Sequence, residues 1–65
     1  MKVKFARLVI TVDKDIKKLP MKSQIAEHIR YTAAHMGMFP NMIVEHVYFE
    51  TFNEYGDGIV DFHFK

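Results

Sequence analysis

The sequence has 65 residues, of which 49% are hydrophobic and 26% are charged. A chain of this length forms one domain, residues 1–65, and buries only roughly 60% of the surface that its unfolded form exposes. It contains no cysteine, which excludes disulfides and thiolate-bound zinc, so packing or self-association must supply the stability. No stretch approaches the roughly 20 apolar residues that span a bilayer, and we therefore expect a soluble cytoplasmic protein.

The first expected element is a strand over residues 2–12, which is rich in β-branched side chains and is followed by a turn signal at 13–15. Its apolar residues do not all fall on the same face of an extended chain. Val3 and Phe5 fall on one face of an extended chain, whereas alternate apolar residues from Leu8 onward fall on the other. This pattern predicts either a bulge between Phe5 and Leu8 or a strand that is covered on both faces.

The main helix is predicted over residues 21–36. Pro20 stands where a first helical turn tolerates it, and Gly37 is a natural stop. Apolar side chains within this range recur at spacings of three and four, which places them on one stripe that packs on a sheet. The stripe consists of Met21, Ile25, Ile29, Thr32 or Ala33, and Met36.

Two further strands are expected at residues 42–52 and 59–64, which are rich in Val, Ile, Tyr and Phe, with a hairpin loop of glycines and polar residues between them. The element order is then β-α-β-β. If the helix returns the chain so that the first two strands are parallel, the third lies between them and is antiparallel to both. We therefore predict an α+β fold in which one helix packs on one face of a three-stranded antiparallel sheet, with strand order 1-3-2 or its mirror.

The charges are divided unevenly along the chain. Residues 1–32 carry eight basic and three acidic side chains, a net charge of +5, whereas residues 33–65 carry one basic and five acidic side chains, a net charge of −4. A basic strand edge and loop can follow a phosphate backbone, so a nucleic-acid-binding regulator is one functional hypothesis, although the acidic half would repel the same backbone. The residues that would contact nucleic acid are Lys2, Lys4, Arg7, Lys14, Lys17, Lys18 and Lys22. Lysines on an edge strand also protect it against aggregation, which is the structural alternative for Lys2 and Lys4.

The four histidines do not indicate a metal site. His28 and His35 are two helical turns apart, roughly 10 Å, which is too far to share one ion. His46 and His63 can meet across the hairpin, but two imidazoles do not complete a tetrahedral set. We therefore expect no bound metal.

Catalytic machinery is equally hard to find. The only serine is Ser23, and no glycine-rich phosphate loop precedes a helix. Glu45, Glu50 and Asp61 are expected on a solvated strand face rather than in a cleft. The sequence thus predicts a protein that is not an enzyme and has no cofactor.

Apolar residues exceed what one helix can cover. The predicted strand at 42–52 carries large apolar side chains on both of its faces, which predicts a protein interface, in the first place with a second copy of the chain. On the helix, a second stripe at spacings of four, three and four combines apolar bodies with polar tips and fits a protein-binding surface, unless it is only the flank of the buried face. This stripe consists of Gln24, His28, Tyr31 and His35.

The favoured hypothesis is a small dimeric protein-binding module that blocks or bridges a larger partner protein in stoichiometric amounts. Small cysteine-free chains are often accessory proteins of phages or mobile elements that inhibit a host protein, and we expect that kind of role here by association alone. The alternative is the nucleic-acid-binding regulator that uses the basic N-terminal half.

Overall fold

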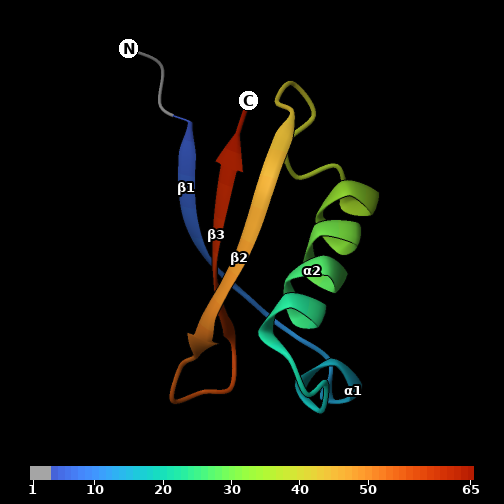
Figure 1. Ribbon diagram of the computed structural model, residues 1–65, viewed down its shortest axis with the longest axis vertical. Helices are drawn as coiled ribbons and strands as arrows, with labels where there is room; N and C mark the ends of the chain where they lie inside the picture. Colours follow the sequence, from blue (N-terminus) through green and yellow to red (C-terminus); the bar gives the residue numbers. More distant parts are fainter. Residues whose placement is uncertain (1–3) are drawn as a thin grey trace.

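The computed structural model describes residues 4–65 and shows a sheet with one main helix beside it (Figure 1). Its elements are β1 (Phe5–Ile10), the short helix α1 (Lys14–Lys17), the main helix α2 (Lys22–Met36), β2 (Val44–Phe52) and β3 (Gly58–Phe64). The α+β fold and the expected order of strands and main helix are confirmed, and α1 is an additional helical turn before α2. Lys2 and Val3 of the expected first strand lie outside the described residues.

The sheet has the predicted topology. Its strand order is β1-β3-β2, and β3 runs antiparallel to both neighbours. β1 and β2 are therefore parallel, and the crossover through α1 and α2 joins them, as parallel strands require. The hairpin between β2 and β3 is closed by Asn53, whose side-chain oxygen accepts hydrogen bonds from the backbone N–H groups of Tyr55 and Asp57, each at 2.9 Å.

The core lies between α2 and the central strand. Val60 and Phe62 of β3 are fully buried, because β3 has a strand on each side and the helix above it. From α2, Ile25, Ile29 and Ala33 are buried in the same cluster. The centre of the predicted apolar stripe is therefore confirmed.

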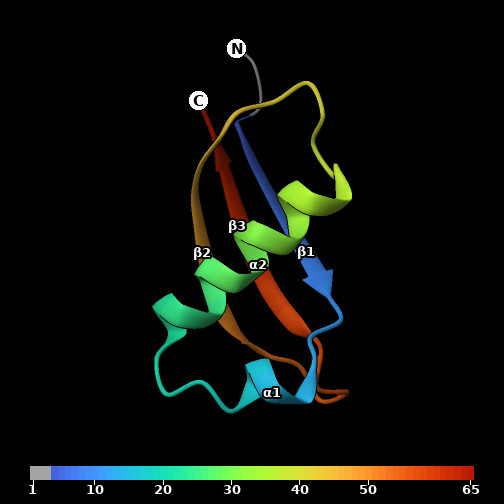
Figure 2. The same cartoon turned by 90° about the vertical axis from the view of Figure 1, so that its right-hand side faces the viewer.

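The two ends of the predicted stripe are not buried. Met21 and Met36 are 56% and 70% exposed. Figure 2 shows the reason: α2 crosses the sheet diagonally, so that its N-terminal end lies toward the side of β2 and its C-terminal end overhangs β1. α2 ends as predicted at Gly37, whose left-handed conformation (φ 65°, ψ 38°) lets its N–H group donate to the carbonyls of Ala33 and Ala34.

Two irregularities in β2 correct the expectation that its apolar residues lie on both faces. The pairing with β3 shifts twice, and the extra residues at the shifts are Glu45 and Glu50. Because side chains alternate along a strand, each extra residue reverses the facing of those that follow. All the large apolar residues of β2 other than Tyr48 thus pack against the core, namely Val44, Val47, Phe49 and Phe52. The pattern of β2 therefore does not by itself require a second copy.

β1 differs from the expectation in the opposite way, because it has no bulge. It pairs with β3 without interruption from Phe5 to Ile10. Alternate residues pack toward the core, namely Ala6, Leu8 and Ile10. The residues between them face the other side of the sheet, where Phe5 and Val9 are 44% and 62% exposed. The strand is neither bulged nor fully covered on both faces.

Candidate functional site

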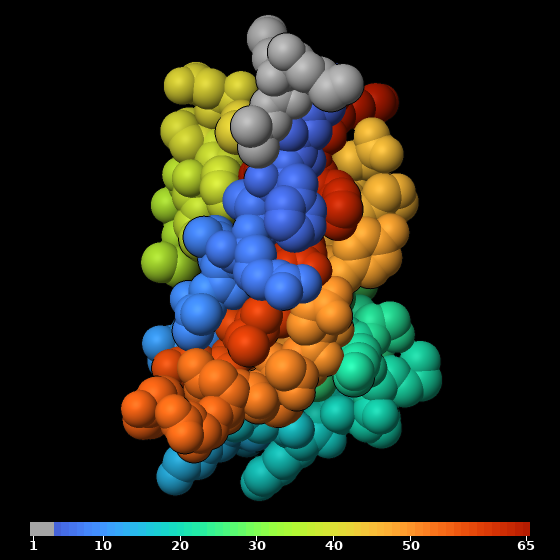
Figure 3. Space-filling view, turned by 90° about the vertical axis from the view of Figure 1, so that its left-hand side faces the viewer, coloured from blue at the N-terminus to red at the C-terminus, as the bar shows by residue number. Residues whose placement is uncertain are grey.

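α2 leaves one face of the sheet uncovered, and this face is named the open face. Figure 3 shows it, with β1, β3 and β2 next to one another. Strand alternation and register place three residues of each strand on it. They are Phe5, Arg7 and Val9 of β1, Ile59, Asp61 and His63 of β3, and His46, Tyr48 and Thr51 of β2. Because Phe5, Val9 and Tyr48 are all exposed, the open face is partly apolar.

An ion pair between Arg7 and Asp61 occupies the centre of the open face. The two residues are cross-strand partners, and Nε and Nη2 of Arg7 donate to the two carboxylate oxygens of Asp61 at 2.7 and 2.9 Å. Asp61 is only 5% exposed, whereas the Arg7 side chain is 57% exposed. The expectation that Asp61 lies on a solvated strand face is therefore wrong. The bidentate geometry fixes both side chains on the sheet.

The ion pair determines the ionisation of Asp61. The hydrogen bonds from Arg7 hold the pKa of Asp61 below its ordinary value of 3.8, although burial acts in the opposite direction. Glu50 and His63 lower the same pKa further. The hydrogen bond to Asp61 in turn raises the pKa of Arg7. Both groups are charged at neutral pH, and together they carry no net charge.

Four aromatic rings gather at one end of the open face. The His63 ring meets the rings of Phe5 and Tyr48 edge to face, with centroids 5.0 and 5.3 Å away, and the Tyr48 ring lies 5.8 Å from that of His46. These four residues are named the aromatic cluster. The expected approach of His46 to His63 across the hairpin agrees with their register. Phe5 and Tyr48 were missed as their neighbours, because the shift at Glu45 sets the face to which Tyr48 points.

The charge that remains on the open face is acidic. Glu50 is exposed and lies close enough to Arg7 and Asp61 to influence the pKa of both. Glu45, the other extra residue of β2, is also exposed, and its carboxylate lies 3.7 Å from Nε2 of His46. Since Arg7 and Asp61 cancel, these two glutamates dominate the charge along the β2 side of this face.

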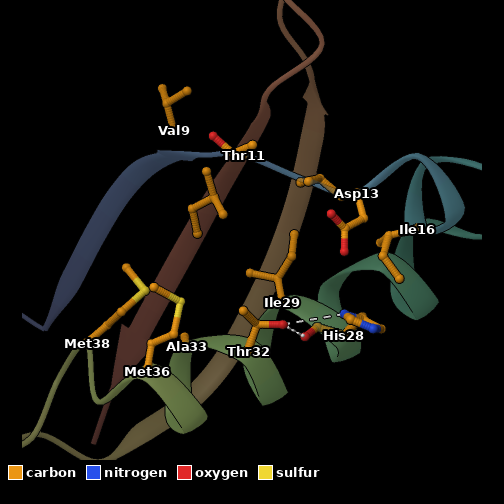
Figure 4. A pocket seen from close by; sticks show the side chains of 12 residues that line it. Val9, Thr11, Asp13, Ile16, His28, Ile29, Thr32, Ala33, Met36 and Met38 are labelled. Atoms are coloured by element: carbon orange, nitrogen blue, oxygen red, sulfur yellow. Dashed lines mark hydrogen bonds between the residues drawn. The ribbon is translucent and has the colours of Figure 1, made fainter.

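An apolar groove runs between β1 and α2 (Figure 4). Its volume is about 420 Å³, and the residues on its floor include Ile29 and Ala33 of α2. Three of its lining residues are large, apolar and exposed, namely Val9, Met36 and Met38. The C-terminal end of α2, which contributes Ala33 and Met36 to this groove, extends past β1 (Figure 2).

The helix stripe predicted as a protein-binding surface is exposed at all four positions, Gln24, His28, Tyr31 and His35. Tyr31 and His35 stack with centroids 6.1 Å apart and planes 8° from parallel. His28 instead lines the groove, and its backbone carbonyl accepts a hydrogen bond of 3.0 Å from the Thr32 hydroxyl. The stripe is therefore divided between two places on α2, and its role in binding stays a prediction.

The predicted basic surface is not a single patch. Lys4 directly precedes β1, which begins at the end of the sheet away from α1 (Figure 1), and Arg7 is neutralised by Asp61. The remaining lysines are in or beside α1, namely Lys14, Lys17, Lys18 and Lys22. Even here the charges are mixed, because the Lys17 ammonium lies against Gly56 in the hairpin loop that carries Glu54 and Asp57. The fold thus brings together the two halves of opposite charge.

Within residues 4–65, no three histidine or acidic side chains are placed to hold one metal ion. No helix in the same range is long and apolar enough to cross a membrane. Searches for similar protein-family models, curated proteins and solved structures found no match. Function must therefore be inferred from the surfaces just described.

Proposed function

We propose that this chain is a non-enzymatic protein-interaction module, which self-associates and docks a larger partner protein on its open face. The observation that carries the proposal is the composition of this face. Exposed Phe5, Val9 and Tyr48 surround an ion pair whose two charges neutralise each other. Interfaces commonly place aromatic and apolar groups, with few unpaired charges, at their centre.

The charge of the open face supports a protein partner over a nucleic acid. Once Arg7 and Asp61 cancel, exposed Glu45 and Glu50 remain on its β2 side. Phosphate groups would be repelled there, whereas a lysine or arginine of a partner protein would be attracted. We therefore expect a partner surface that offers an apolar group to Phe5 and Tyr48 and a basic side chain to the glutamates.

The same features support a stoichiometric mode of action. A partner that lies across the rings of Phe5 and Tyr48 is covered rather than chemically changed, so binding would block part of its surface. Inhibition of a host protein by an accessory protein of a phage or mobile element is the biological role that we associate with such blocking.

A nucleic-acid-binding regulator remains the competing function, because four lysines do gather around α1: Lys14, Lys17, Lys18 and Lys22. Their surface is mixed in charge, since Asp13 and Asp15 lie in the same segment and Lys17 faces the acidic hairpin loop. Binding through these lysines would show the steep salt dependence of phosphate contacts. Binding through the open face, with apolar contacts at its centre and only a few charge contacts, would depend on salt much less steeply.

Capture from a lysate of the source organism, followed by mass spectrometry, tests the proposal. The immobilised wild-type chain is compared with Tyr48→Ser, which alters the open face, and with Tyr31→Ser, a matched change on α2. We expect the wild type and Tyr31→Ser to retain the same protein at low and high salt and after nuclease treatment, and Tyr48→Ser to lose it. A captured species that disappears with nuclease, and also with Lys14, Lys17 and Lys18 changed to Gln, would establish the competing function instead.

A further inference from the structure

β1 is an edge strand whose outer backbone groups are regularly spaced. The N–H group of Phe64 donates to the carbonyl of Lys4 at 2.8 Å, so the backbone of Lys4 points toward β3. In an antiparallel pair, the direction of these groups alternates along the strand. The N–H and C=O groups of Phe5, Arg7 and Val9 therefore point away from β3, toward the outer edge.

The two edge strands of the sheet, β1 and β2, are not equally able to pair with an additional strand. β2, at the other edge, is interrupted by extra residues at Glu45 and Glu50, and both bulges and charged side chains protect an edge against pairing. β1 pairs in uninterrupted register with β3 along its whole length. Its outer edge is thus a regular template for one more strand.

The space beside β1 already has an apolar cover. The C-terminal end of α2 overhangs this edge, with Met36 and Met38 exposed above the groove (Figures 2 and 4). A strand added to β1 would lie under these methionines. Its alternate side chains would have to be apolar and of moderate size to occupy the groove.

We propose that the added strand is β1 of a second copy, so that two chains form one continuous six-stranded sheet. This proposal rests on the self-association in the proposed function, and the outer edge of β1 is the surface that the two copies would share. β1 itself carries the required alternation, since Ala6, Leu8 and Ile10 face the helix side. A two-fold axis makes the two strands antiparallel, and because β2 is bulged, only one edge of each chain pairs and the assembly closes as a dimer.

The charges and the length of the paired segment together select a register for this pairing. Antiparallel registers that use the outward groups of Phe5, Arg7 and Val9 bring Ala6, Arg7 or Leu8 opposite its own copy. The register centred on Arg7 would place two guanidinium groups directly opposite each other, which is unfavourable. The register centred on Leu8 places Arg7 opposite Val9 of the second copy instead. The register centred on Ala6 also separates the guanidinium groups, but within β1 (Phe5–Ile10) it pairs only residues 5–7, whereas the register centred on Leu8 pairs residues 6–10. We therefore assign the two-fold axis to Leu8.

Single cysteine substitutions test this register, because the chain contains no other cysteine that could form a disulfide. Residues that face each other in a non-hydrogen-bonded pair have Cα atoms about 4.5 Å apart, which a disulfide can span. We expect Leu8→Cys to give a covalent dimer on mild oxidation. The matched control is Ala6→Cys, whose copies would be about 13 Å apart at roughly 3.3 Å per residue and should not be linked. A link in Ala6→Cys but not in Leu8→Cys would overturn the assigned register.

Analytical ultracentrifugation tests the interface itself. We expect the wild type to sediment at twice its chain mass of 7.7 kDa at micromolar concentration. Val9→Pro removes an outward N–H group and spares the pairing with β3, so it should weaken the dimer at least about 100-fold, whereas Val9→Thr should not. Val9→Lys serves the same purpose if the proline variant does not fold.

A wild-type protein that stays at 7.7 kDa, with no link in either cysteine variant, would overturn the proposal. This failure is distinct from a failure of the proposed partner binding. A monomer could still retain its partner through Tyr48 in the capture experiment, and a dimer could lack any partner.

Discussion

The middle of the central strand β3 is buried on both faces of the sheet, but by different means. On the helix side, Val60 and Phe62 are fully buried beneath α2. On the open face, Asp61 lies between them in the chain and is only 5% exposed, although no helix covers it. Its cover includes the Arg7 side chain on the neighbouring strand. The comparison shows that one face is stabilised by packing and the other by a cross-strand ion pair, so the two faces should respond differently to substitution.

The largest effect is expected on the helix side. Ile25→Asp places an unpaired charge in the core and should cost about 4 kcal/mol or more, which is enough to unfold a domain of this size. His28→Ala and His35→Ala, on exposed positions of the same helix, should remain folded. Circular dichroism during thermal melting measures all three. If the histidine variants were as unstable as Ile25→Asp, the assignment of the buried side of α2 would be wrong.

The next effect concerns the ion pair on the open face, and it should be asymmetric. Arg7→Met leaves the buried carboxylate of Asp61 without its partner, whereas Asp61→Asn leaves a guanidinium that water can still solvate. We therefore expect Arg7→Met to lower the melting temperature by about 10 °C and Asp61→Asn by clearly less. Equal losses in the two variants would show that the carboxylate is not effectively buried.

The stability of the wild type and that of Arg7→Met should change in opposite directions as the pH falls. The pKa of Asp61 is below 3.8 in the folded chain, so its contribution to stability is present above the ordinary carboxyl pKa and is lost as the pH falls below it. In Arg7→Met the buried carboxyl should instead favour its neutral form, and this variant should recover stability as the pH falls from 7 toward 4. Melting curves for both proteins from pH 7 down to about pH 2, a range that includes the fall below the ordinary carboxyl pKa, test the sign of the two slopes.

The smallest effects on stability should come from the exposed rings. Tyr48→Ser and Tyr31→Ser remove side chains that are 50% and 64% exposed, and each should cost roughly 1 kcal/mol or less. Their effects on binding should differ, because Tyr48 belongs to the aromatic cluster and Tyr31 lies on the outer side of α2. Denaturant melts and partner-binding titrations of both variants measure this difference. Equal loss of binding in the two variants would indicate that the helix stripe shares in the interface.

The fold could be predicted from local patterns because each element carries its own signal. The spacing of Ile25, Ile29 and Ala33, together with the stop at Gly37, was sufficient for the main helix. Chain connectivity then determined the strand order. The exposed ends of the helix stripe could not be foreseen, because the crossing angle between helix and sheet is a tertiary property.

The candidate site was harder to predict, because it depends on register. The extra residues Glu45 and Glu50 decide which side chains of β2 face outward, and nothing in their local sequence marks them as bulges. The pairing of Arg7 with Asp61 joins residues 54 positions apart. The sequence did contain a signal for this pair. Arg7 and Asp61 are oppositely charged, each lies between apolar residues, and the predicted strand order makes their strands neighbours. The charge division along the chain was misleading for the same reason, because pairing across the sheet brings the two halves together.

The most direct test of partner binding on the open face is a map of the amide signals that change when a captured and purified partner is added to the labelled chain. We expect changes at the open-face positions, above all Phe5, Tyr48 and His63, with the amides of α1 unaffected at both low and high salt. Changes confined to Lys14, Lys17, Lys18 and Lys22, and present only at low salt, would contradict the account.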